Sequence, residues 1–157
     1  MIVQGKLIID PKDVTKKHFR QASWKRVAII QFPGDDTDKM WRWYLKKRYG
    51  LELNQPLRNS HVTIINDKFD DNAKWQEFKM KFNNMAVSID LSKELRSNGE
   101  HWWLKVNSTP QIKDLRDYLN LGEPFFRYHL TIGLANERNI EHSEYILRQI
   151  LRSDTQY

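Results

Sequence analysis

A short pattern occurs twice in the chain, and it limits the possible folds more than any other feature of the sequence. The segment NSHVTIIND contains His61 and Thr63, and RYHLTIGLA contains His129 and Thr131. Both copies read histidine, aliphatic, threonine, isoleucine, and a proline stands at the same offset before each histidine. Each copy predicts a β-strand, because alternating side chains would place its histidine and threonine on one face and its aliphatic residues on the core face.

The residues around the two copies predict the same order of elements. Apolar periodicity and turn residues indicate strands and helices, with Gly50 closing one helix, Thr109 capping another and Gly122 ending it. In chain order we expect a strand at 23–32, a turn and helix at 33–50, the first His-Thr strand, a helix at about 72–84, strands at 86–95 and 100–108, a helix at 109–122, the second His-Thr strand at 127–135 and a helix at 139–151. The order strand, helix, His-Thr strand, helix therefore appears twice.

This order indicates an internal duplication, roughly residues 23–85 and 100–151, within a single domain that spans residues 1–157. A chain of 157 residues is long enough for one domain with a sizeable core. The expected fold class is α+β, with two pseudo-symmetric sheet-and-helix lobes around a central cleft. The two His-Thr strands are expected near the pseudo-two-fold axis, facing that cleft.

Charge and composition narrow the possible partners. Lys and Arg number 26 against 20 Asp and Glu, so the net charge is +6. This favours an anionic partner such as a nucleic acid, a nucleotide or a lipid surface, although the charge can also serve solubility alone. The sequence has no cysteine, which excludes disulfides, thiolate catalysis and cysteine zinc sites. We see no signal peptide and no apolar run of membrane-spanning length, so a cytoplasmic location is expected.

Two histidines in matched contexts suit acid–base chemistry, whereas a lone histidine of this kind is usually structural. Imidazole titrates near neutrality, so one ring can take a proton from an attacking hydroxyl while the other gives one to a departing oxygen. The threonine hydroxyls can donate to phosphate oxygens that gain charge in the transition state. We expect His61, Thr63, His129 and Thr131 to catalyse in-line displacement at a phosphodiester, without a metal or another cofactor.

The paired motifs resemble a known family. HVTI and HLTI resemble the His-x-Thr-hydrophobic signature of the two-histidine, LigT-like phosphoesterase superfamily, and EPFFRYHLTIGLA is similar to its second motif. The resemblance covers roughly residues 23–151 in motif order and duplicated layout. It implies a bilobal α+β fold, metal-independent phosphodiester chemistry and catalytic roles for the four motif residues. Within the superfamily, the size and motif spacing are most similar to phage nucleases that destroy cyclic nucleotide signals of bacterial antiphage defence, the anti-CBASS type.

The resemblance implies hydrolysis of a 3′–5′ linkage in a cyclic di- or oligonucleotide signal. The enzyme would be a monomer or small homo-oligomer without membrane attachment, acting in the host cytoplasm if a phage encodes it. One alternative is an RNA 2′,3′-cyclic phosphodiesterase. Another is a catalytically idle module that binds RNA or a nucleotide, which turnover would distinguish from both enzymes.

Three further residues are expected to contact the substrate. Trp103 lies on the face of its strand opposite the core, and Phe125 and Arg127 continue the alternation backwards from His129. Flat rings suit a base and a cation suits a phosphate. The alternative is that the two aromatic rings pack within the fold and that Arg127 is an ordinary surface charge.

The helix expected within 33–50 carries charges that we interpret as structural. Capping and the helix dipole explain the acids Asp35, Asp36 and Asp38 better than a metal site does. Helical geometry leaves Trp43 on the more exposed side, where it could meet a partner. The segment KKRYG together with Arg42 forms a basic face, for which solvation is expected and contact with nucleic acid is the alternative.

Overall fold

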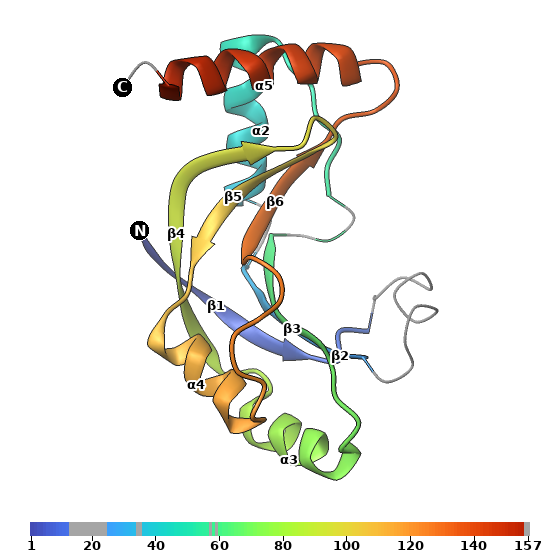
Figure 1. Cartoon of the computed structure of the whole chain (residues 1–157), viewed down its shortest axis with the longest axis vertical. Coiled ribbons are helices and arrows are strands. Elements are labelled where there is room, and N and C mark those ends of the chain that lie inside the picture. The colour runs from blue at the N-terminus through green and yellow to red at the C-terminus, as the bar shows by residue number, and fades with distance from the viewer. Residues whose placement is uncertain (13–24, 34–35, 57, 59, 156–157) are drawn as a thin grey trace. The chain divides into compact units, whose positions relative to one another are not determined.

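A computed structural model describes residues 1–12, 25–33, 36–56, 58 and 60–155 (Figure 1). This part of the chain forms six strands and four helices, and the strand pairs are antiparallel. The elements are β1 Ile2–Ile9, β2 Lys25–Gln31, α2 Asp36–Tyr49, β3 His61–Lys68, α3 Asn72–Phe82, β4 Ala86–Ser97, β5 His101–Asn107, α4 Pro110–Tyr118, β6 His129–Leu134 and α5 Ile140–Thr155. The expected α+β class is confirmed, and the repeated order occurs as β2-α2-β3-α3 and β5-α4-β6-α5.

The chain divides into two compact units, each built from three separate segments. Unit 1 comprises Met1–Phe32, His61–Leu91 and Val106–Tyr128, and unit 2 comprises Pro33–Ser60, Ser92–Lys105 and His129–Tyr157. Each unit holds one His-Thr strand, β3 in unit 1 and β6 in unit 2. The helices do not follow the repeats, because α2 belongs to unit 2 and α4 to unit 1. The pseudo-symmetric arrangement around a cleft stays a prediction.

Unit 1 contains a sheet in the order β4-β1-β2-β3. Its interior is aliphatic and aromatic because the inward positions of these strands carry large apolar residues, which α3 and α4 cover with their own apolar stripes. Buried members include Leu7, Ile9, Ile30, Val62, Trp75, Phe78, Val87, Ile89, Ile112, Leu115 and Leu119. Gly5 occupies an inward position of β1, where an added Cβ would lie 2.7 Å from Cγ2 of Ile30.

Helix α4 begins as expected and ends earlier than expected. The Thr109 side chain accepts a hydrogen bond from the Ile112 amide, and proline stands at the first helical position. The helix ends at Tyr118 rather than at Gly122, and both Asn120, with a φ of +56°, and Gly122, with a φ of +66°, are left-handed in the segment that follows. Asparagine is the residue other than glycine that most readily adopts this conformation at a helix end.

Unit 2 holds the β5–β6 pair, helices α2 and α5, and the hairpin turn between β4 and β5. The turn forms where Ser97, Asn98 and Gly99 were expected to form it, and Gly99 has a φ of +96°. Helix α5 is joined to this hairpin by a buried polar contact. The Trp102 indole donates to the Ser143 hydroxyl at 2.8 Å, and that hydroxyl donates to the Gly99 carbonyl at 2.5 Å.

No helix in the described part of the chain combines the length and the apolar character needed to cross a bilayer.

Removing the Ser143 hydroxyl should destabilise the fold. Ser143→Ala leaves the buried indole N–H of Trp102 without its partner, and an unsatisfied buried donor costs about 1–3 kcal/mol. We expect the free energy of unfolding in urea to fall by about that amount. Ser108→Ala is the matched control, because the Ser108 hydroxyl is exposed and makes only a 3.5 Å contact. Equal unfolding midpoints for the two variants would contradict the role given to Ser143.

Candidate functional site

The first His-Thr motif opens β3 in unit 1. His61 stands opposite Gln31 of β2, and Thr63 stands opposite Ile29. Both motif side chains are half-buried, whereas Val62 between them is fully buried. The expected separation of a polar face from an aliphatic core face is confirmed for this copy.

The register of β3 breaks immediately after the motif. Thr63 stands opposite Ile29, but Ile65 stands opposite Ala28, the next residue of β2. Ile64 is therefore an extra residue in the strand, and Ile64 and Ile65 are both fully buried. Such a β-bulge bends the strand, increases its twist and changes the direction of neighbouring side chains.

The second motif opens β6 in unit 2. His129 stands opposite Lys105 of β5, and Thr131 stands opposite Trp103. The His129 side chain is exposed and Thr131 is half-buried, whereas Leu130 between them is buried. The polar and aliphatic faces are again separated as expected.

The register of β6 breaks at the same place in its motif. Thr131 stands opposite Trp103, but Gly133 stands opposite Trp102, so Ile132 is the extra residue. Ile132 is buried as expected, and the shift leaves Leu134, which alternation alone would place in the core, half-buried. The likeness of the two copies thus extends from residue order to backbone conformation, with a bulge at the isoleucine of each motif.

A buried arginine binds the bulge of the first copy. Arg116 of α4 is 1% exposed, and its Nη1 donates to the Ile64 carbonyl at 2.9 Å. Nη1 and Nη2 also donate to the two carboxylate oxygens of Asp67, each at 2.9 Å, and Nε donates to the Gly122 carbonyl. Burial, the largest single effect, lowers the pKa of the guanidinium, but the hydrogen bonds and charge of Asp67, with smaller contributions from Tyr128 and Glu123, raise that pKa overall.

A second arginine binds the bulge of the second copy. Nη1 of Arg42, on α2, donates to the Ile132 carbonyl at 2.9 Å and also to the Asp38 carboxylate. Asp38 is fully buried and accepts a further hydrogen bond from the Ser60 hydroxyl. Each bulge carbonyl therefore receives a hydrogen bond from the helix that precedes the other motif in the chain: α4 supplies β3 and α2 supplies β6.

Two structural interpretations of the α2 charges need correction. Arg42 is not on a solvated face, because its side chain is only 14% exposed and is held by Asp38. Asp38 is a buried ion-pair partner rather than only a cap or dipole partner, and the amide of Asp38 faces the Ser60 hydroxyl at 3.4 Å. Asp36 is the first residue of α2, and Asp35 lies outside the described residues.

The structure places Trp103 beside the second motif. Trp103 is half-buried on β5, and its ring centroid lies 6.2 Å from that of His129 in an edge-on arrangement. Its neighbour Trp102 is buried, so the expected division of this strand into core and non-core faces is confirmed. Lys105, directly opposite His129, is half exposed and lies 3.8 Å from Glu94.

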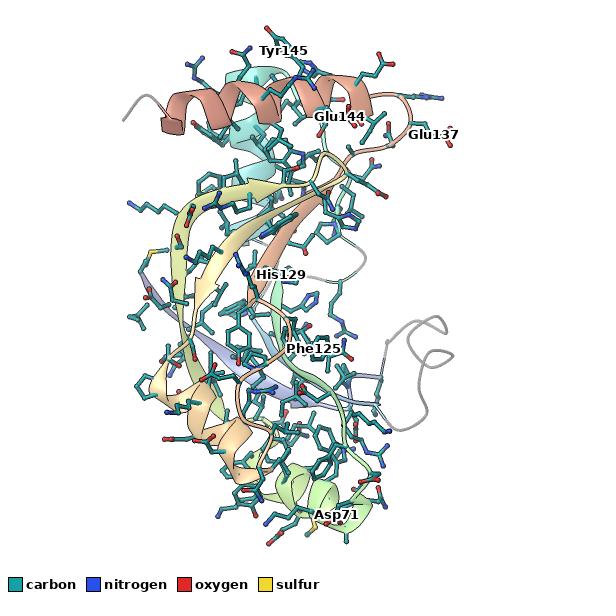
Figure 2. The ribbon with its side chains drawn as sticks, in the orientation of Figure 1. Asp71, Phe125, His129, Glu137, Glu144 and Tyr145 are labelled. Carbon is teal, nitrogen blue, oxygen red and sulfur yellow. The ribbon has the colours of Figure 1, made fainter. Side chains whose placement is uncertain are left out.

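Phe125 and Arg127 do not share a strand with His129, contrary to the prediction. The expected strand at 127–135 begins only at His129, and Phe125 lies in the preceding loop (Figure 2). Strand alternation therefore does not reach either residue. Phe125 is 73% exposed and Arg127 is exposed, so contact of either side chain with a substrate stays a prediction.

The two bulge-binding arginines were not predicted from the sequence, although a sequence pattern pointed to each of them. Asp38 and Arg42 have the i,i+4 spacing of a helical ion pair. Arg116 follows Ile112 by one helical turn and therefore belongs to the apolar stripe of α4, where a charge needs a buried partner. That partner, Asp67, is distant in sequence and so could not be named in advance.

Within the described ranges, no group of three or more His, Cys, Asp or Glu residues has the proximity needed to hold a metal ion. Comparisons with protein-family models, with curated proteins and with solved structures found no match.

Removing the guanidinium of Arg116 should strongly destabilise the fold. Arg116→Met leaves the Asp67 carboxylate largely buried without its partner, and breaking a buried pair in this way costs about 3–5 kcal/mol. Asp67→Leu combined with Arg116→Met removes both charges and should recover part of that loss. A cost of about 1–3 kcal/mol should persist, because the Ile64 carbonyl still lacks its donor.

These free energies can be measured by urea unfolding of the single and double variants. Full recovery in the double variant would show that the carbonyl contact contributes nothing. A single variant as stable as wild type would contradict the buried ion pair itself.

Proposed function

We propose that the chain is a metal-independent phosphodiesterase in which His61 and His129 act on one phosphodiester as acid and base. The observation that carries the proposal is the duplicated motif: two His-x-Thr strands share residue order, a polar face and a bulge at the following isoleucine. Two matched titratable groups can supply the general base and the general acid of a displacement at phosphorus.

In the proposed reaction one imidazole takes the proton of the attacking hydroxyl as its oxygen forms a bond to phosphorus. The other imidazole, as imidazolium, gives its proton to the oxygen whose bond to phosphorus breaks. Thr63 and Thr131 donate hydrogen bonds to the remaining phosphate oxygens, whose charge grows in the transition state. The attacking hydroxyl belongs either to water or to the 2′ position of the substrate.

For the substrate we propose a cyclic di- or oligonucleotide cut at a 3′–5′ linkage, as in phage evasion of CBASS defence. The net charge of +6 suits a polyanionic ligand. Trp103 beside His129 offers a ring for a base, and Lys105 opposite His129 offers a cation for a phosphate. RNA with a 2′,3′-cyclic phosphate end is the competing substrate, and the turnover assay described below includes both substrates.

Replacing either histidine by alanine should slow turnover by roughly 10²–10⁴-fold, because each contributes one proton transfer. The double variant should be little slower than the slower single variant, since groups that act as a unit are not additive. The assay incubates each protein, in excess EDTA, with cyclic dinucleotides, cyclic trinucleotides and cyclic-phosphate-ended RNA, and identifies products by mass.

His101→Ala is the matched control, because His101 is an exposed strand histidine outside the motifs. Melting temperatures serve as the folding check. Well-folded His61→Ala and His129→Ala proteins with wild-type rates would refute the proposal. Tight binding of a nucleotide without turnover by wild type would identify an idle binding module instead.

Trp103→Ala should mainly weaken substrate binding. A stacked base contributes about 1–3 kcal/mol in single-strand binders, so KM should rise with a smaller change in kcat. Phe125→Ala tests the loop ring in the same way. Tyr145→Ala is the control, because Tyr145 is a 51% exposed aromatic residue on α5 (Figure 2). Unchanged KM for both Trp103→Ala and Phe125→Ala would remove these rings from the substrate site.

A further inference from the structure

A cavity of about 750 Å³ lies in unit 2, and its lining does not include the histidines or threonines of the two motifs. It is formed by the second half of α2, the segment that follows this helix and the loop that precedes α5. Its lining comprises Arg42, Trp43, Lys46, Gly50, Glu52, Leu53, Asn54, Asn136, Arg138 and Asn139. This volume falls within the range of small-molecule sites in proteins, about 300–1,000 Å³.

The cavity carries an excess of positive charge. Arg42, Lys46 and Arg138 line it together with one carboxylate, that of Glu52, while Asp38, which is not part of the lining, offsets the charge of Arg42. Arg42 is fixed before any ligand arrives, because its Nη1 is held by Asp38 and by the Ile132 carbonyl. Lys46 pairs with Glu52 at 2.7 Å, but both side chains are more than half exposed, and an ion pair of that kind is easily exchanged for a bound anion.

The cavity also offers a flat ring and amide groups. Trp43 is 60% exposed, as helical geometry predicted, although a large aromatic side chain gains by burial. The side chains of Asn136 and Asn139 bind backbone amides within their own loop and so fix its shape. The backbone of Asn54 pairs with Leu134, which holds the exposed Asn54 at the cavity wall.

We propose that this cavity binds a nucleotide, with the base stacked on Trp43 and the phosphate held by Arg42, Lys46 and Arg138. Planar rings beside fixed cations are the combination that recognises a base and its phosphate together. The carboxamide of Asn54 has both donors and an acceptor for a base edge. The ligand can be a free nucleotide or one nucleotide of a single-stranded RNA. The site does not depend on the proposed phosphodiesterase activity.

The test is calorimetric titration of the full chain with adenosine 5′-monophosphate, which contains no phosphodiester to cut. Trp43→Ala should weaken binding by about 5- to 150-fold, the factor that corresponds to one stacked base. Arg138→Glu should weaken it at least as much. Tyr145→Ala and Arg148→Glu are matched controls on α5 that alter an exposed ring and an exposed arginine outside the cavity, and both should bind as wild type does.

Further titrations separate the cavity from the motifs and identify the source of the nucleotide. The His61→Ala/His129→Ala protein should bind adenosine 5′-monophosphate as wild type does, which makes failure of this proposal distinct from failure of the catalytic one. With the same double variant, a hexamer of adenylate should bind at least tenfold tighter than adenosine 5′-monophosphate if the natural ligand is RNA. It should bind no tighter than adenosine 5′-monophosphate if the natural ligand is a free nucleotide.

Three results would overturn the proposal. The first is the absence of binding by both the nucleotide and the hexamer at millimolar concentration. The second is binding that Trp43→Ala and Arg138→Glu leave unchanged. The third is binding of inorganic phosphate as tight as that of the nucleotide, because the base would then contribute nothing to the affinity.

Discussion

In each His-Thr strand of this protein, the carbonyl at the β-bulge accepts a hydrogen bond from an arginine of its own unit: the buried Arg116 for β3 and the mostly buried Arg42 for β6. Arg116 donates to the carbonyl of Ile64, and Arg42 donates to the carbonyl of Ile132, both at 2.9 Å. Both acceptors belong to the bulge residue, which a β-bulge takes out of the regular ladder and which therefore needs another donor. The two arginines therefore satisfy the carbonyls that the bulges take out of the ladder.

These two arginines contribute to stability differently from the arginine of a surface ion pair. A buried ion pair is often no more stabilising than well-packed apolar residues, because desolvation offsets much of the attraction. An apolar replacement here would satisfy neither the carboxylate nor the bulge carbonyl. Arg116 satisfies both the carboxylate and the bulge carbonyl, since its guanidinium binds Asp67 with two nitrogens and also donates to the carbonyls of Ile64 and Gly122. We interpret the Arg116–Asp67 and Arg42–Asp38 ion pairs as interactions that position the bulged strands more than they stabilise the fold.

Arg42 connects two features of unit 2 that are distinct in the sequence. It binds the bulge of β6 from one side and lines the cavity at the end of α2 on the other. The bulge of β6 and the proposed nucleotide site therefore share the guanidinium of Arg42. Any anion that enters the cavity meets a guanidinium whose position is already determined by Asp38 and Ile132.

Local patterns determined much of the secondary structure. Alternation and periodicity predicted the repeated order of elements, the apolar stripe of α4, the turn at Gly99 and the polar faces of both motifs. They did not predict β1, because Gly5 occupies an inward position of that strand and hides its apolar alternation. The strand expected at 127–135 was too long, and its alternation was carried too far back to Phe125, since aromatic residues continue into the loop before His129.

The sequence by itself determined which residues form strands and helices and that two histidine motifs match, because these are local properties of hydrophobic period and residue order. Only the tertiary structure decided that α2 belongs with β6 and α4 with β3, and that Arg42 and Arg116 lie against the bulges. Those pairings join residues 90 and 52 positions apart. A charged residue at a core position indicates that a buried partner must exist, because an unpaired buried charge is costly. Only the folded chain shows which distant carbonyl and carboxylate are that partner.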